Sequence, residues 1–118
     1  MSIKIIIAED ELIIAKANAI MLTKLGYEVE VVKNAADVIS AVKTFNPAII
    51  LMDIHFKKDQ PTGIDAAKEI RKNNNVPIIF TSGNKPDGIK KLSNVSHLTK
   101  PVNIELLKQT IIEYTSVV

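Results

Sequence analysis

The sequence predicts an α/β protein built around a doubly wound parallel sheet. Five short apolar runs, rich in Ile and Val, alternate with longer segments in which apolar residues recur at helical spacing. Runs this short suit buried strands, and strands that alternate with helices form parallel sheets with helices on both faces. The 118 residues and the 47% hydrophobic content fit a single compact domain over residues 1–118.

The expected strands differ in how they are covered. They span residues 3–8, 29–32, 48–52, 77–80 and 95–98. The first and third runs are almost continuously apolar, as central strands should be, whereas residues 28–32 alternate between acidic and apolar residues, as an edge strand does. We therefore expect a (βα)5 flavodoxin-like sandwich with a five-stranded parallel sheet of order 2-1-3-4-5.

The intervening segments carry helix signals. Ile13, Ala17 and Ile20 recur at i, i+4 and i+7, which predicts a helix after the first strand. Asn34 and Asn103 stand where N-caps are expected. The βα unit is therefore expected five times.

Composition excludes several classes of protein. Lys and Arg number 15 against 13 acidic residues, and a net charge of +2 is too small to indicate a nucleic acid or an anionic membrane as partner. The chain has no cysteine, which excludes disulfides and thiolate metal sites. No apolar run approaches the roughly 20 residues of a membrane span. We expect a cytoplasmic protein with no direct nucleic-acid partner and no membrane partner.

Polar residues of distinctive chemistry follow four of the expected strands. Glu9 and Asp10 follow the first, Asp53 the third, Thr81 the fourth and Lys100 the fifth. The carboxyl ends of parallel strands meet at one edge of the sheet, where ligands of open α/β sheets bind. The sequence therefore predicts that these side chains converge on one site.

Each of these residues also has a purely structural interpretation. Asp10 could cap the helix that starts near Glu11, and the others could be ordinary loop residues. Together, however, three carboxylates would repel each other, by roughly 4 kcal/mol per pair at 4 Å and an effective dielectric of 20. Lys100 and a hard divalent cation such as Mg²⁺ would offset this repulsion. Such a site suits the transfer of a phosphoryl group onto a carboxylate.

The residues at these strand ends resemble those of the receiver domains of response regulators in two-component signalling. The resemblance extends over the whole chain. The matching motifs, in the family's order and spacing, are Glu9-Asp10, Leu51-Met52-Asp53, Phe80-Thr81-Ser82 and Lys100-Pro101. The resemblance implies a phosphoacceptor module, of the stand-alone type, that assists its own phosphorylation and is no enzyme in the usual sense.

The resemblance also assigns roles to residues. Asp53 would attack a phosphohistidine, Lys100 would pair with the phosphoryl oxygens, and Thr81 would turn inward to hydrogen-bond one of them. The Lys100-Pro101 peptide bond is expected to be cis. The ligands of Mg²⁺ would all be oxygens, from Asp10, from Asp53, from Glu9 through a water molecule, and from the main-chain carbonyl of His55.

The implied partners are proteins. The phosphodonor would be a sensor histidine kinase or a histidine phosphotransfer protein. A downstream protein target would bind the surface of residues 85–118, which comprises the fourth helix, fifth strand and fifth helix of the family. The protein would be a monomer or a weak dimer.

Three departures from the family pattern affect what the resemblance implies. His97 occupies the position of the usual switching Tyr or Phe, so the usual coupling is in question. The loop from His55 to Gly63 is about two residues longer than the common pattern, and Gly83 replaces a larger residue.

Two alternative functions remain open. One is a pseudo-receiver that binds proteins constitutively without phosphorylation, which the His97 substitution keeps open. The other is a small Mg²⁺-dependent aspartyl phosphohydrolase, although Asp53-Ile54-His55 lacks the second acid of the Asp-x-Asp motif of such enzymes.

Overall fold

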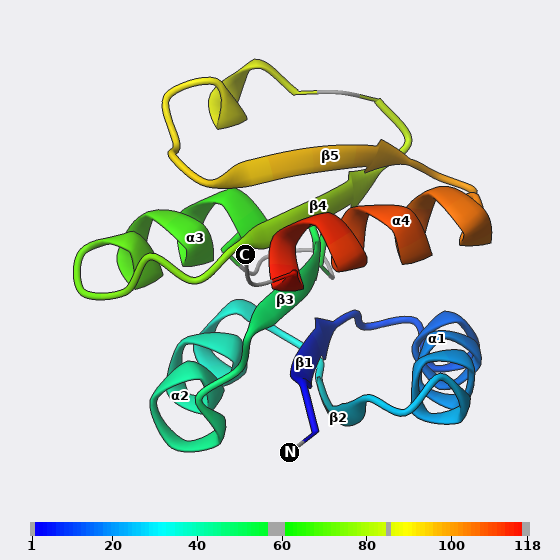
Figure 1. Cartoon of the computed structure of the whole chain (residues 1–118). Helices are drawn as coiled ribbons and strands as arrows, with labels where there is room; N and C mark the ends of the chain where they lie inside the picture. Colours follow the sequence, from blue (N-terminus) through cyan, green and yellow to red (C-terminus); the bar gives the residue numbers. More distant parts are fainter. Residues whose placement is uncertain (1, 57–60, 85, 117–118) are drawn as a thin grey trace.

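The computed structural model describes residues 2–56, 61–84 and 86–116 (Figure 1). The expected strands are present, each five residues long, and α-helices follow all of them except β4. In chain order the elements are β1 (Lys4–Ala8), α1 (Leu12–Lys24), β2 (Glu28–Val32), α2 (Ala35–Phe45), β3 (Ile49–Asp53), α3 (Gly63–Arg71), β4 (Ile78–Ser82), the 3-10 helix η1 (Asp87–Ile89), β5 (Val95–Thr99) and α4 (Ile104–Thr115).

The five strands form one parallel sheet of order β2-β1-β3-β4-β5, which confirms the expected fold class. β1, β3 and β4 lie inside the sheet, and almost all of their residues are buried. The alternating strand β2 lies at an edge, as its sequence predicted. The order of the strands reverses between β1 and β3, so the switch point lies where these two strands end.

Helices cover both faces of the sheet and make two cores (Figure 1). α2 and α3 lie on one face and enclose a core that includes Phe80 and Val38. α1 and α4 lie on the other face, where Leu22, Leu107 and Ile111 pack against the sheet. Neighbouring strand residues point to opposite faces, so each strand contributes to both cores.

The helix boundaries follow local chemistry. Asn34 and Asn103 cap α2 and α4 through their side chains, as predicted. The N-cap of α1 is Glu11 and not Asp10, so the capping interpretation of Asp10 is not supported. Gly26, with φ of 98°, follows the end of α1.

The apolar row that predicted α1 lies on its exposed side. Ile13 is 84% exposed and Ile20 is also exposed, whereas Ala15 and Leu22 are the buried residues of the helix. α1 is apolar around most of its circumference, so apolar spacing identifies the helix without identifying its buried face.

The expected helix between β4 and β5 is the main correction to the predicted architecture. The described part of this connection, residues 83–84 and 86–94, contains only the 3-10 helix η1. Gly83, Pro86 and Gly88 disfavour a longer helix, and Ile89 is the one residue of η1 that is buried. The surface expected over residues 85–118 therefore consists of this short turn, β5 and α4.

Part of the lengthened loop and the end of the chain lie outside the described residues. Residues 57–60 of the lengthened loop lie outside the described residues, as do Lys85 and residues 117–118. Among the described residues, no helix is both long and apolar enough to span a bilayer.

Candidate functional site

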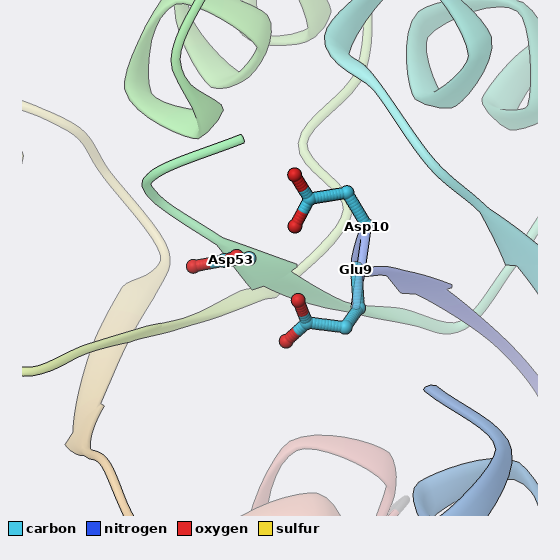
Figure 2. Close-up of side chains that lie close together, drawn as sticks. All are labelled: Glu9, Asp10 and Asp53. Carbon is cyan, nitrogen blue, oxygen red and sulfur yellow. The ribbon is translucent and has the colours of Figure 1, made fainter. Parts of the chain in front are cut away.

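The three predicted carboxylates lie together at the carboxyl edge of the sheet (Figure 2). One oxygen each from Glu9, Asp10 and Asp53 lies within 4.8 Å of the other two. Glu9 and Asp53 are buried, and Asp10 is half-buried. Asp53 is 43 residues from Asp10 and 44 from Glu9 in the chain, so the fold brings it to the other two.

Parallel pairing explains this convergence. Ala8 of β1 lies opposite Met52 of β3, so both strands end at the same level of the sheet. The main-chain N–H of Glu9 donates to the carbonyl of Val32 at 3.0 Å, which extends pairing with β2 by one residue and holds Glu9 at the edge. Asp53 is the last residue of β3. The acidic residues therefore stand where β1 and β3 end, at the same edge of the sheet.

Lys100 joins two of the carboxylates. Its Nζ lies 3.1 Å from Oε1 of Glu9 and 3.3 Å from Oδ1 of Asp53. The side chains of the two acids are each 5% exposed, against 28% for Lys100, so the lysine covers them from the solvent side. The Lys100-Pro101 bond is cis, as expected. With three carboxylates and one ammonium group, the cluster is left with an excess of negative charge when all groups are ionised.

The pKa of Glu9 is raised above its ordinary value of 4.5. Burial is the main cause. The hydrogen bond from the Glu11 N–H lowers the pKa, the charge of Asp53 raises it, and Lys100 lowers it again. For Lys100, burial would lower the pKa, but the hydrogen bond to Glu9 and the charges of Asp53 and Glu9 outweigh it and raise the pKa. Lys100 is thus held in its charged form, whereas burial favours the neutral form of Glu9.

The donor set suits a hard divalent cation. All three side chains offer carboxylate oxygens, which Mg²⁺ and Ca²⁺ prefer. A cation bound there would also offset the repulsion between the carboxylates that the single charge of Lys100 does not offset. His55 lines the same pocket and donates its main-chain N–H to Oδ1 of Asp53 at 3.2 Å. The role of the His55 carbonyl as a metal ligand stays a prediction.

Two cavities meet at Asp53 and Lys100. A polar pocket of about 470 Å³ lies on one side, and an apolar groove of about 530 Å³ lies between α1 and α4 on the other. The polar pocket is lined by Asp10, Glu11, Asp53, His55, Ser82, Gly83 and Lys100. The acid–lysine cluster therefore separates a hydrophilic opening from a hydrophobic one.

The hydroxyl predicted to serve this site, Thr81, lines the apolar groove, whose lining also includes Glu9, Asp53 and Lys100. Its neighbour Ser82 lines the polar pocket. Both are buried. Ser82 shares its pocket with Asp10 and His55, and Thr81 does not appear in that lining. The role of Thr81 stays a prediction, and Ser82 is a site residue that the sequence analysis missed. In the register of β3 and β4, Asp53 pairs with Thr81, so Thr81 lies on the same face of the sheet as Asp53, and Ser82 lies on the opposite face.

The comparisons with known proteins agree with this geometry. Residues 5–112 match the family described as the response regulator receiver domain. The transcriptional regulatory protein PdtaR of Mycobacterium tuberculosis is 33% identical over 108 residues, which cover 86% of this chain and 51% of that protein. The chain thus spans about half the length of this relative.

Solved structures show the same architecture. The receiver domain of the Francisella response regulator 1452 has a TM-score of 0.82 and 27% identity, and the match covers 96% of this chain and 97% of that one. The receiver domain of Ssk1 from Saccharomyces cerevisiae, solved with the histidine phosphotransfer protein Ypd1, has a TM-score of 0.85 and 24% identity, with 96% and 88% covered. Fold, family match and relatives agree, and the chain belongs to the response regulator receiver domain family.

Proposed function

We propose that this chain is the phosphoacceptor module of a two-component phosphorelay, with Asp53 as the residue that is phosphorylated. The observation that carries the proposal is the cluster in which Glu9, Asp10 and Asp53 meet at the switch point under Lys100. An acidic site beside a fixed ammonium group is suited to receive a phosphoryl group.

The transfer is a displacement at phosphorus. An oxygen of Asp53 forms a bond to the phosphorus of a phosphohistidine, and the P–N bond breaks. Its electron pair returns to the imidazole, which takes up a proton, and Asp53 becomes an acyl phosphate. Lys100, already 3.3 Å from Oδ1, would stay beside the phosphoryl oxygens, and its raised pKa keeps it protonated.

A magnesium ion is the cofactor that this chemistry requires. Its ligands would be the side chains of Asp10, Asp53 and Glu9, with Glu9 acting through a water molecule, and the main-chain carbonyl of His55. When bound, the ion supplies positive charge that offsets both the carboxylates and the incoming phosphoryl group. The proximity of the three carboxylates, with one oxygen of each within 4.8 Å of the other two, supports this assignment.

The phosphodonor would be a sensor histidine kinase or a histidine phosphotransfer protein, the kind of partner present in the Ssk1 structure. The apolar groove between α1 and α4 opens at Asp53, so a donor seated there would reach the acceptor. The exposed residues Ile13, Ile20 and Ile104 border this region, and Lys24 and Lys108 lie beside them. We infer that the donor presents an apolar surface flanked by acidic residues.

The output would be a change in protein binding rather than catalytic turnover. A phosphoryl group adds about two negative charges at the carboxyl edge. The surface that would respond is formed by η1, β5 and α4, within residues 86–116, because β5 pairs with β4 directly beside the site. The downstream target would be a protein that distinguishes the two states of this surface.

The test is incubation with acetyl phosphate, with and without Mg²⁺, followed by intact mass measurement. We expect the mass of one phosphoryl group to be added only with Mg²⁺, to be labile, and to be absent in the Asp53→Asn variant. Continued turnover of phosphate esters would indicate a phosphohydrolase instead. No addition from any donor would indicate constitutive binding, and either result would overturn the proposal.

A further inference from the structure

The apolar groove between α1 and α4 extends from the surface of the molecule down to the sheet. Ala17 and Ile104 line its walls, Ile7 and Leu51 of the central strands line its base, and Asn18 is the one polar side chain between them. Its volume of about 530 Å³ lies in the range of small-molecule pockets. At about 30 Å³ per heavy atom, as for liquid water, a volume of 530 Å³ has room for roughly 17 heavy atoms.

One end of this groove is polar. Glu9, Asp53, Thr81 and Lys100 line it at the carboxyl edge of the sheet. Asp53 pairs with Thr81 in the register of β3 and β4, so both side chains lie on the face that α1 and α4 cover. Figure 2 shows the Glu9 side chain on the side of these helices and that of Asp10, which lines the polar pocket, on the other. An apolar body that ends in a few polar groups is typical of a site for an amphipathic molecule.

The hydroxyl of Thr81 points independently to a ligand. Thr81 is only 4% exposed, and its hydroxyl makes no hydrogen bond to any residue that the structure describes. The oxygen is not enclosed by protein atoms, so it opens into the groove that Thr81 lines. A buried polar group without a partner costs free energy. A molecule in the groove that donates a hydrogen to this oxygen would be stabilised by the bond.

The charges at the polar end favour a positively charged group. Glu9 and Asp53 carry two negative charges when ionised, and Lys100, with Nζ 3.1 Å and 3.3 Å from their oxygens, offsets one. Asp10 adds a further carboxylate within 4.8 Å. A cation would therefore be attracted to this end, whereas an anion would meet two carboxylates.

We propose that the groove is a binding site for a small amphipathic cation. The apolar body of the molecule would lie between α1 and α4, and its ammonium group would donate hydrogen bonds to the Thr81 hydroxyl and to the carboxylates of Glu9 and Asp53. No covalent bond changes. The molecule would cover Asp53 from the groove side and so slow its phosphorylation. This effect rests on the function proposed above, but the binding itself does not.

The binding is tested by calorimetry with the unphosphorylated protein in EDTA. The probes are octylamine, octanol and octanoate, which share one chain and differ in charge. We expect octylamine to bind, octanol to bind at least tenfold more weakly, and octanoate more weakly still. Each buried methylene corresponds to about a fourfold change in affinity, so hexylamine should bind roughly fifteenfold more weakly than octylamine. No binding of octylamine, equal affinity for octanoate, or no effect of chain length would overturn the proposal.

Substitutions locate the bound molecule. Thr81→Val keeps the shape of the side chain and removes the hydroxyl, which should weaken octylamine binding about tenfold, the effect of one hydrogen bond to a charged group. Ala17→Phe places a ring at an exposed position of α1 that lines the groove, and should weaken binding more than tenfold. Thr23→Leu enlarges another exposed residue of α1, outside the groove lining, and should stay within about twofold. Equal effects of Ala17→Phe and Thr23→Leu would contradict the assignment, and melting temperatures without ligand show that each variant is folded.

The effect on phosphorylation is tested with phosphoramidate and Mg²⁺, since this donor does not acetylate amines. Octylamine should slow the labelling of Asp53 over the concentration range in which it binds, octanoate should not, and labelling of the Ala17→Phe variant should resist octylamine. Binding that leaves the labelling rate unchanged would overturn the inhibitory effect. If the wild type takes no phosphoryl group even without octylamine, the proposed function fails, while calorimetry alone decides whether the groove binds the amine.

Discussion

Gly63, the first residue of α3, lies against the end of β3, and we predict that Gly63→Ala destabilises the protein. A Cβ at this position would lie 2.2 Å from the main-chain oxygen of Asp53 and 2.9 Å from Cγ of Met52. The first distance falls 1.2 Å short of the 3.4 Å at which ordinary contacts begin. The obstructing atom belongs to buried main chain and cannot rotate away.

The size of the effect follows from overpacking. Forcing an extra methyl group into a packed site costs about 1–3 kcal/mol, and contact with main chain places Gly63→Ala in the upper half of that range. A net loss of about 2 kcal/mol would lower the melting temperature of a domain of this size by roughly 10 °C. Thermal unfolding followed by circular dichroism measures this shift.

Gly83, which lines the polar pocket, provides a control. A Cβ there would meet no heavy atom within 4 Å, so Gly83→Ala should change the stability by less than about 0.5 kcal/mol. Because the displaced atom belongs to Asp53, Gly63→Ala should also slow phosphorylation at temperatures well below unfolding. Wild-type stability for Gly63→Ala, or an equal loss for Gly83→Ala, would refute the reasoning.

Three further predictions concern other parts of the molecule. The raised pKa of Glu9 means that the folded protein binds the Glu9 proton more tightly than the unfolded chain, so the stability of the metal-free protein should fall as pH rises from 4.5 through the folded pKa. Thermal unfolding in EDTA measures this loss, which the Glu9→Gln variant should lack. The same pH dependence of stability in the wild type and the variant would contradict the prediction. Arg71 donates to three main-chain carbonyls at 3.0–3.1 Å, so Arg71→Lys should cost about 2 kcal/mol in urea unfolding, while Lys72→Ala, which removes only an exposed ion pair, should cost under about 0.5 kcal/mol. Ile13→Asp should slow phosphorylation by a phosphohistidine protein and leave labelling by acetyl phosphate unchanged, and equal slowing with both donors would exclude the groove as the docking site.

The sheet and the acidic cluster could be predicted because both depend on patterns that are visible in the sequence. Continuous apolar runs marked β1 and β3 as central strands, and alternation marked β2 as an edge. Once the strands are parallel, residues that follow them must meet at one edge. Glu9 and Asp53 lie together for that reason, and Lys100, which follows the last strand, lies beside both.

The rest depends on tertiary packing that local patterns do not encode. Ile13 and Ile20 identified α1 but lie on its exposed side, because a helix that is apolar all round does not specify its buried face. Thr81 and Ser82 are adjacent hydroxyls on opposite faces of the sheet, and the pairing of β3 with β4 places Thr81 on the face of Asp53. The connection after β4 formed a 3-10 turn because its glycines and proline outweigh its few apolar residues.

The most direct test of the central claim is to locate the phosphoryl group in the chain. An acyl phosphate is reduced by borohydride, which converts an aspartyl phosphate to homoserine. After incubation with acetyl phosphate and Mg²⁺, peptide mass spectrometry should find homoserine at position 53 and nowhere else, and chelation of Mg²⁺ should abolish it. Homoserine at another position, or a stable phosphoryl mass on a hydroxyl residue with Asp53 unchanged, would contradict the account.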